Sequence, residues 1–139
     1  MSLSIEEVFA RAKEDTISAN ISYVFDAPIH YIVLKRSDNT ISMPWMEEFH
    51  AVLDRIEASK GPGVVVTIGT GKKNFSTGFD MMPWYKDPAL FYPSNVKLQA
   101  LARRLMMFSL PTMCVFNGNS IAGGYLLGLG FDFRIMNGA

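Results

Sequence analysis

Several features that define whole classes of protein are scarce in this sequence. Its 139 residues include one cysteine, Cys114, and two histidines. A single cysteine excludes a disulfide framework or a thiolate zinc site within one chain, which fits a reducing compartment. Thirteen basic and thirteen acidic side chains cancel to a net charge of +0. No overall field therefore attracts nucleic acid or an anionic membrane, and an anionic ligand must be held by local contacts.

Long apolar runs and targeting patterns are scarce too. The longest apolar stretch, residues 121–136, contains Asp132 and Arg134 and is too short to cross a bilayer, so we predict no membrane span. Residues 1–13 carry Glu6 and Glu7 and lack the pattern of a signal or transit peptide. The sequence therefore does not decide between mitochondrion, peroxisome and cytoplasm as the location of the protein. The apolar fraction of 49% is ample for one compact domain.

Two common nucleotide motifs and a metal site are excluded by spacing. Gly69-Thr70-Gly71-Lys72-Lys73 lacks the glycine that a P-loop needs at Val66 and the hydroxyl that it needs at Lys73. A third glycine, which a dinucleotide fingerprint requires, is also missing, so we interpret the lysines as a solvated turn. His30 and His50 have no clustered carboxylates at ligand spacing, so we predict neither a metal site nor a catalytic histidine.

Hydrophobic periodicity predicts an α/β domain. A capping box at Ser4 predicts a helix over residues 5–13, and the runs 21–25 and 29–34 indicate an antiparallel hairpin. Apolar residues from Trp45 to Ile56 predict a helix, followed by a buried strand over 63–68. The proline-rich segment 83–93 favours an irregular, lid-like connection. After it we expect a helix capped by Ser94, a strand over 112–116, a helix from Gly123 and a strand over 132–136.

The sequence does have two glycine-bearing turns, residues 74–80 and 117–124, each after a β-like run. Together they could aim bare backbone N–H groups into one pocket, an arrangement that holds a carbonyl oxygen and stabilises an oxyanion. Gly124 and Gly128 form a small-x-x-x-small pair that favours close packing of a helix. Asp80 and Asp132 could act as acid or base, or could equally cap a helix or tie down a turn.

These motifs together resemble one family. Asn74-Phe75-Ser76-Thr77-Gly78-Phe79-Asp80-Met81, Asn117-Gly118-x-x-x-Ala122-Gly123-Gly124 and Asp132-Phe133-Arg134-Ile135 are similar to the enoyl-CoA hydratase/isomerase (crotonase) superfamily. Leu34 to Ser42 resembles that family's first CoA-contacting loop. The resemblance implies an α/β fold, a crotonase-like ββα spiral that is incomplete at the C-terminus. Residues 21–139 would form a partial acyl-CoA-binding domain, and residues 1–20 an N-terminal helical extension.

The resemblance also implies a ligand and the residues that bind it. The substrate would be a coenzyme A thioester, with no separate cofactor, and the backbone N–H groups of Phe79 and Gly123 would form an oxyanion hole. The residues implied to bind substrate are Arg36, Asn39, Ser76, Thr77, Gly78, Phe79, Asp80 and Gly123. Arg36 or Lys35 would pair with the CoA phosphates. Family members form oligomers, so we expect a homo-oligomer or a place in a larger assembly.

One position departs from the family's hydratases. They carry a glutamate where this chain has Leu126, which cannot orient a water, so hydration is not expected. The family's Δ3,Δ2-enoyl-CoA isomerases use a glutamate farther along, which would lie beyond Ala139. Because family members are considerably longer, we expect the remainder to follow Ala139 in a longer protein or to come from another chain. We predict an enoyl-CoA isomerase-like protein; the alternatives are a non-catalytic crotonase-like subunit and, less specifically, a generic nucleotide-binding domain.

Overall fold

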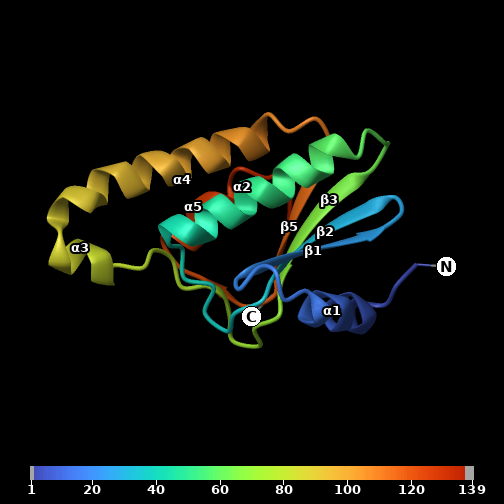
Figure 1. Ribbon diagram of the computed structural model, residues 1–139, viewed down its shortest axis with the longest axis horizontal. Coiled ribbons are helices and arrows are strands. Elements are labelled where there is room, and N and C mark those ends of the chain that lie inside the picture. The colour runs from blue at the N-terminus through green and yellow to red at the C-terminus, as the bar shows by residue number, and fades with distance from the viewer. Residues whose placement is uncertain (1, 137–139) are drawn as a thin grey trace.

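The computed structural model describes residues 2–136, which form a five-stranded sheet covered mainly by two long helices (Figure 1). The sheet order is β1-β2-β3-β5-β7, with bounds Ile21–Asp26, Ile29–Leu34, Val64–Gly69, Thr112–Phe116 and Phe133–Met136. β1 and β2 pair antiparallel, as the sequence predicts, and the remaining neighbours pair parallel. This arrangement confirms the predicted α/β class.

The helices α2 (Met43–Ala58) and α4 (Phe91–Met106) lie side by side over one face of the sheet (Figure 1). Ser42 caps α2 by accepting a hydrogen bond from Trp45 N, and Trp45, Phe49 and Leu53 are fully buried beneath it. Burying large side chains of this kind contributes roughly 1.5–3 kcal/mol each. The predicted spacing from Trp45 to Ile56 is therefore confirmed as the buried face of α2.

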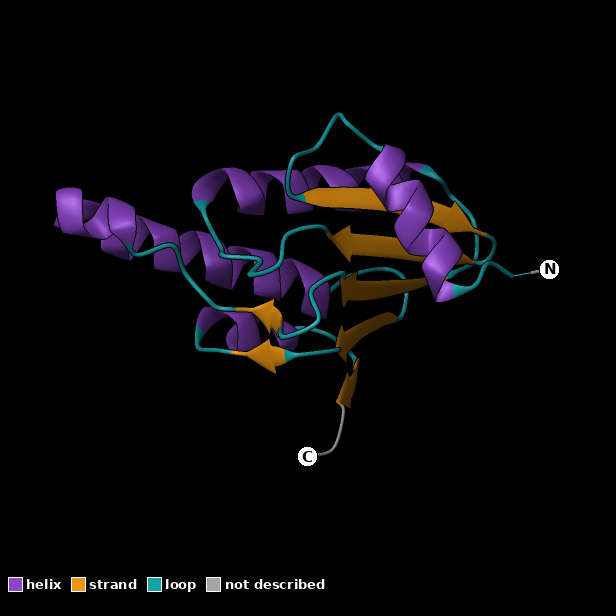
Figure 2. Ribbon diagram, turned by 90° about the horizontal axis from the view of Figure 1, so that it is seen from below, coloured by secondary structure: helices purple, strands orange, loops and turns teal. Residues whose placement is uncertain are grey.

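The N-terminal helix α1 (Ile5–Glu14) lies across the opposite face of the β1–β2 hairpin (Figure 2). The predicted capping box is present, since Glu7 N donates to Ser4 Oγ and Ser4 N donates to Glu7 Oε2. Val8 and Ala12 on this helix pack with Val24 and Val33 in a second, smaller apolar cluster. The helix thus covers part of the sheet face that α2 and α4 leave free.

The segment between β4 and α4 corrects one prediction. Residues 83–93 are not irregular, because they contain α3 (Met82–Lys86), the 3-10 helix η1 (Pro88–Leu90) and the start of α4. Ser94 is not the cap of α4, since the helix begins at Phe91 and the Ser94 hydroxyl donates to Leu90 O. Pro93 fits because prolines are tolerated in the first turn of a helix, where the missing N–H has no intrahelical acceptor.

Two short parallel strands, β4 (Asn74–Ser76) and β6 (Asn119–Ser120), form a separate small sheet beside α5 (Gly123–Gly128), as Figure 2 shows. The sequence analysis did not predict them as strands, because runs of two or three residues are too short to show alternation. Within residues 2–136, none of the helices has the length and hydropathy needed to cross a membrane.

Glu48 on α2 fixes the connection between α1 and β1. Its carboxylate accepts hydrogen bonds from the Ser18 hydroxyl, from Asn20 N and Nδ2 at 3.0 and 2.6 Å, and from Ile21 N at 3.1 Å. Replacing Glu48 with alanine leaves these donors without their acceptor, so the free energy of unfolding should fall by about 2 kcal/mol in urea titrations. The neighbouring variant Glu47→Ala is the matched control, because Glu47 is exposed and lies 3.7 Å from Lys97. Equal effects of the two variants would contradict this role.

Arg104 joins α4 to α2 through a neutral histidine. Its guanidinium donates to His50 Nδ1 at 3.0 Å and to His50 O at 3.1 Å, and it pairs with Asp54 and Glu57. Burial, together with the nearby Arg104 charge, lowers the pKa of His50 below its ordinary value of 6.5. Burial likewise lowers the pKa of His30, whose Nδ1 lies 2.9 Å from the Tyr23 hydroxyl.

These two lowered values predict a direction for stability with pH. The unfolded chain binds protons near pH 6.5 while the folded chain still excludes them, so the stabilisation is complete above pH 6.5 and is lost as the pH falls through the folded pKa values. Urea unfolding at pH 7.5 and pH 5.5 should therefore give a lower free energy at pH 5.5. An unchanged or higher value at pH 5.5 would contradict the structure, and His50→Gln should reduce the difference.

Candidate functional site

The fold brings the two glycine-bearing turns together. β4 from the first turn pairs with β6 from the second, in the register Asn74↔Asn119 and Ser76↔Ser120. Ile121 N then donates to Ser76 O at 3.0 Å, which extends the contact toward the start of α5. Segments about forty residues apart in sequence thus lie side by side, beside α5 and the large sheet (Figure 2).

Gly78 allows a close approach between the turns. Its φ of +88° favours glycine, and a methyl group added there would lie 2.8 Å from Ile121 O and 3.3 Å from Gly123 N. The backbone at Gly78 therefore lies directly against the backbone at Gly123. Because Phe79 follows Gly78, the structure brings the two predicted N–H donors into the same neighbourhood.

Two backbone N–H groups of these turns have no partner within residues 2–136 and could donate to a ligand. Ile41 N donates to Gly78 O at 2.7 Å and Ile41 O accepts from Asp80 N at 2.9 Å, so this edge of the first turn is paired. The Phe79 N–H between them has no hydrogen-bond partner among residues 2–136. The same is true of the Gly123 N–H, although Gly124 N is bonded to Ile121 O at 2.9 Å. Buried backbone donors are normally paired, so two free donors on neighbouring turns suit an acceptor that a ligand supplies.

Alanine at position 122 turns the chain into α5 in a strained conformation. Its φ of 45° and ψ of −112° lie outside the regions that alanine favours. Two residues later, Gly124 packs closely on β4, since an added methyl group would lie 2.7 Å from Ser76 Cβ and 3.1 Å from Ser76 O. This confirms the close packing predicted for the Gly124 and Gly128 pair. Backbone strain of this kind persists where surrounding contacts hold it, as they do here.

The loop that contains Arg36 and Asn39 lies beside the first turn. Thr77 N donates to Asp38 O at 2.8 Å, and the Thr77 hydroxyl lies 3.2 Å from that of Thr40. Arg36 is exposed, with its Nε 3.7 Å from Asp38 Oδ1. Its guanidinium therefore remains accessible to an anion. Lys35, by contrast, donates from Nζ to the carbonyl oxygens of Asp15 and Ser18, at 2.6 Å each.

Asn39 and Ser76 use their side chains to shape this loop. Asn39 is fully buried with a φ of 44°, and its amide donates to Phe75 O at 2.9 Å while its Oδ1 accepts from Arg36 N. The buried Ser76 hydroxyl donates to Asn39 O at 2.8 Å and accepts from Gly78 N at 3.2 Å. Both side chains therefore have hydrogen-bond partners within the chain. Their role in the site is to hold the loop in shape.

Both candidate acid–base aspartates have structural contacts. Asp80 Oδ1 accepts from Met82 N at 3.1 Å, just before α3. Asp132 Oδ2 accepts from Thr112 N and from the Thr112 hydroxyl at 2.8 and 3.0 Å, which ties the entry of β7 to β5. On α5 the exposed side chains are Tyr125 and Leu126, the latter 55% exposed. Of the interpretations left open for the aspartates, these contacts match a role in tying down turns, and neither aspartate is the N-cap of a helix.

Asn117, the first residue of the second motif, has a structural role that the sequence did not predict. Its amide donates to Gly69 O at 2.7 Å and to Gly71 O at 3.1 Å, and its Oδ1 accepts from Gly69 N. These bonds lock the glycine loop after β3 to the end of β5, just before the second turn. An Asn-Gly pair directly after a buried strand is the sequence signal that could have indicated such a clamp.

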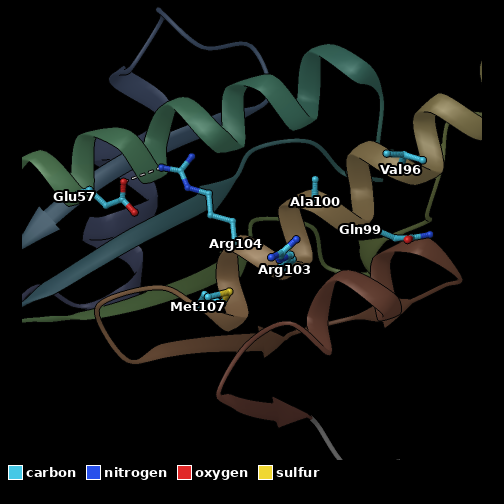
Figure 3. A pocket seen from close by; sticks show the side chains of 7 residues that line it. All are labelled: Glu57, Val96, Gln99, Ala100, Arg103, Arg104 and Met107. Atoms are coloured by element: carbon cyan, nitrogen blue, oxygen red, sulfur yellow. Dashed lines mark hydrogen bonds and ion pairs between the residues drawn. The ribbon is translucent and has the colours of Figure 1, made fainter.

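An open groove of about 530 Å³ lies elsewhere, along α4 beside the end of α2 (Figure 3). It is lined by Glu57, Val96, Gln99, Ala100, Arg103, Arg104 and Met107. Glu57 is paired with Arg104 at 3.0 Å, and the groove includes neither glycine turn. No cluster of metal-ligating side chains is found among the described residues. The two glycine turns therefore remain the better candidate site.

Several known proteins are similar to this chain in sequence and in fold. The chain is 33% identical to the mitochondrial enoyl-CoA delta isomerase 1 of Rattus norvegicus over 99 residues, which are 70% of this chain and 34% of the rat protein. An enoyl-CoA hydratase structure from Thermoplasma volcanium matches with a TM-score of 0.73 and 29% identity, covering 86% of this chain and 48% of that one. An enoyl-CoA hydratase structure from Bacillus anthracis matches with a TM-score of 0.78 and 26% identity, covering 84% of this chain and 47% of that one.

The chain thus spans about a third of the length of its curated relatives and about half of the solved structures. The model of the enoyl-CoA hydratase/isomerase family matches residues 25–139. The structural matches confirm the predicted crotonase-like fold. Since the family match covers most of its length, this chain belongs to the enoyl-CoA hydratase/isomerase family.

Proposed function

We propose that this chain binds an acyl-CoA thioester and stabilises its enolate as part of an enoyl-CoA isomerase-like enzyme. The observation that supports this most directly is the pair of backbone N–H groups, at Phe79 and Gly123, that have no partner among residues 2–136. Two donors converging on one thioester oxygen form an oxyanion hole. They polarise the carbonyl, and the proton on the adjacent carbon becomes acidic.

The loops around these donors suit the rest of coenzyme A. Arg36 is exposed beside the first turn, and an open groove next to it is lined by Lys72 and Lys73 as well as Thr70 and Asn74. Because the net charge is +0, the phosphates would have to be held by local cations of this kind. The backbone N–H groups of Thr77, Gly78 and Asp80 already donate to Asp38 O, Ser76 Oγ and Ile41 O, so these residues would line the ligand without donating to it from the backbone.

Isomerisation is favoured over hydration by one side chain. Leu126 on α5 stands where the family's hydratases have a glutamate, and a leucine cannot orient or activate a water. In an isomerase a base removes the proton from the carbon next to the thioester carbonyl, which forms the dienolate, and the proton is then returned to the far carbon of the former double bond. A carboxylate outside residues 1–139, from a longer chain or from another subunit, would carry that proton. The similarity to enoyl-CoA delta isomerases supports this choice.

Conversion of 3-enoyl-CoA to 2-enoyl-CoA tests the proposal. It is measured spectrophotometrically with the protein and any subunit that purifies with it. Turnover of the 3-enoyl thioester, with no hydration of the 2-enoyl product, is the expected result. Absence of turnover, with acyl-CoA binding intact by calorimetry, would overturn the isomerase assignment while leaving the binding function in place.

A non-catalytic crotonase-like subunit is the second candidate. It is favoured by two observations within residues 2–136: the Asp80 carboxylate already accepts from Met82 N, and Leu126 stands where the hydratases have a glutamate. The exposed apolar side chains Phe133, Ile135 and Met136 on β7 favour association with another chain, as a homo-oligomer or in a larger assembly. A purely structural subunit predicts no affinity for acyl-CoA in calorimetry, whereas a catalytic one predicts saturable binding.

A further inference from the structure

Trp84 is the half-buried residue of an otherwise exposed segment. On α3 and η1 the neighbouring side chains Met82, Tyr85 and Leu90 are exposed. The Trp84 ring instead lies between two other aromatic rings, with centroids 5.0 Å from Phe79 and 4.9 Å from Phe91. Such tilted and edge-on pairs stabilise a fixed ring geometry beyond the burial of apolar area.

A hydrogen bond fixes the polar edge of the same indole. Trp84 Nε1 donates to Ser94 Oγ at 3.2 Å, and Ser94, which is buried in the first turns of α4, donates in turn to Leu90 O at 2.7 Å. The indole is therefore held from two directions, by ring packing and by this hydroxyl. Its orientation is determined by α4, which packs on the body of the domain.

The Phe79 ring lies in contact with both Trp84 and the second turn. A methyl group added to Gly123 would lie 3.2 Å from Phe79 Cδ2 and 3.3 Å from Phe79 Cε2. The ring thus fills the space between Trp84 and the first residue of α5. Gly78 O accepts a hydrogen bond from Ile41 N, and Asp80 N donates to Ile41 O, so the backbone on either side of Phe79 is tied to Ile41. Displacing the ring would therefore change how the Phe79 backbone sits against Gly123.

The hollow on the inner side of this stack is too small to hold a substrate chain. The hollow bounded by Phe79, Trp84 and Ser94, together with Ile41 and Met46, has a volume of about 40 Å³. Ligand pockets are commonly roughly 300–1,000 Å³. The inner side of the stack is packed, so its role is to hold its neighbours in place.

We propose that Trp84, oriented by Ser94, is a positioning residue that sets the spacing between the Phe79 and Gly123 N–H groups. This inference rests on the proposed function, because it assigns Trp84 a role in aligning the same two donors. Trp84 itself acts through the Phe79 ring and makes no contact with the thioester. The carbonyl of a bound thioester is polarised only if both donors reach its oxygen, so a shift of one donor weakens polarisation.

The test measures carbonyl polarisation in the variants Trp84→Leu, Trp84→Phe and Ser94→Ala. Acyl-CoA labelled with 13C at the thioester carbonyl is bound, and the carbonyl stretch is followed by isotope-edited infrared spectroscopy, with free CoA affinity as a second readout. Trp84→Leu should lose most of the red shift and bind acyl-CoA about threefold to tenfold more weakly, with free CoA affinity unchanged. Trp84→Phe keeps the ring packing and loses the donor, so Trp84→Phe and Ser94→Ala should show smaller losses in the same direction.

Tyr85→Leu is the matched control, because Tyr85 is 75% exposed on the same helix and should leave the frequency unchanged. A wild-type red shift that persists in Trp84→Leu would overturn the positioning role and leave the proposed function standing. If Trp84→Leu does not fold, unchanged frequencies in both Trp84→Phe and Ser94→Ala decide against the positioning role. A wild-type protein that binds acyl-CoA without any red shift would instead contradict the oxyanion hole, and this inference with it.

Discussion

Replacing Gly123 with valine is expected to weaken acyl-CoA binding by about tenfold and to reduce isomerase turnover by about 100-fold to 1,000-fold. Even a single methyl group at Gly123 would lie 3.2–3.3 Å from the Phe79 ring and from Leu98 Cδ2. The larger valine must push the second turn outward, which moves the Gly123 N–H away from the thioester oxygen. Calorimetry gives the binding constant and a spectrophotometric assay gives the turnover.

Two comparisons make this result specific. Gly123→Ala should have a smaller effect in the same direction, because the neighbours need to move by only a few tenths of an ångström. Free CoA, which has no thioester carbonyl, should bind to wild type and Gly123→Val equally well. A valine variant that is folded by circular dichroism and retains wild-type acyl-CoA affinity and turnover would contradict the assignment of Gly123 as a donor.

Gly128→Ala is expected to lower the free energy of unfolding by about 3 kcal/mol, a large effect for one methyl group. An alanine Cβ at Gly128 would lie 2.1 Å from Phe116 Cζ and 2.8 Å from Phe116 Cε1. Phe116 is buried and packs edge-on against Phe75 with a centroid distance of 5.0 Å, so its ring has little room to yield. Urea unfolding of the variant beside wild type measures the loss.

Gly61→Ala is the matched control for this substitution. Its added methyl group would come no closer than 3.9 Å to a neighbouring atom, Ser59 O, in an exposed turn after α2. The free energy of unfolding should stay within about 0.5 kcal/mol of wild type. Similar losses in both variants would show that α5 does not depend on close packing against Phe116.

The long periodic elements could be predicted from sequence alone. The spacing from Trp45 to Ile56 and the capping box at Ser4 carry enough local information to specify α2 and α1. The hairpin over 21–34 is similarly encoded by β-branched runs around Asp26-Ala27-Pro28. In each case the residues that specify the element lie close together in the sequence, and the structure confirms the predicted helix or hairpin.

Other features depend on contacts between distant segments. The prolines at 83, 88 and 93 suggested an irregular connection, yet each lies within the first turn of a helix, where proline is compatible with helical structure. The β4–β6 pairing joins Asn74 to Asn119, and no local pattern specifies that pairing. Trp84 looked like one more aromatic residue of the connection, because its partner Ser94 is recognisable only once α4 is seen to begin at Phe91.

The candidate site shows the same division. The residue types of both glycine turns were visible in the sequence, and the resemblance to the family associated Phe79 with Gly123. The approach of Gly78 to Gly123 N, and the absence of partners for both N–H groups within residues 2–136, required the structure. The internal bonds of Asn39 and Ser76 likewise follow from burial, which their sequence positions did not indicate.

The most direct test of the oxyanion hole is a nuclear magnetic resonance titration of 15N-labelled protein with an acyl-CoA thioester. Both proposed donors are backbone amides, so each has its own resonance. The Phe79 and Gly123 amide protons should move downfield together as the thioester saturates the site, and should not move on addition of free CoA. Saturable thioester binding that leaves both resonances in place, or shifts mainly residues of the groove along α4, would contradict the account.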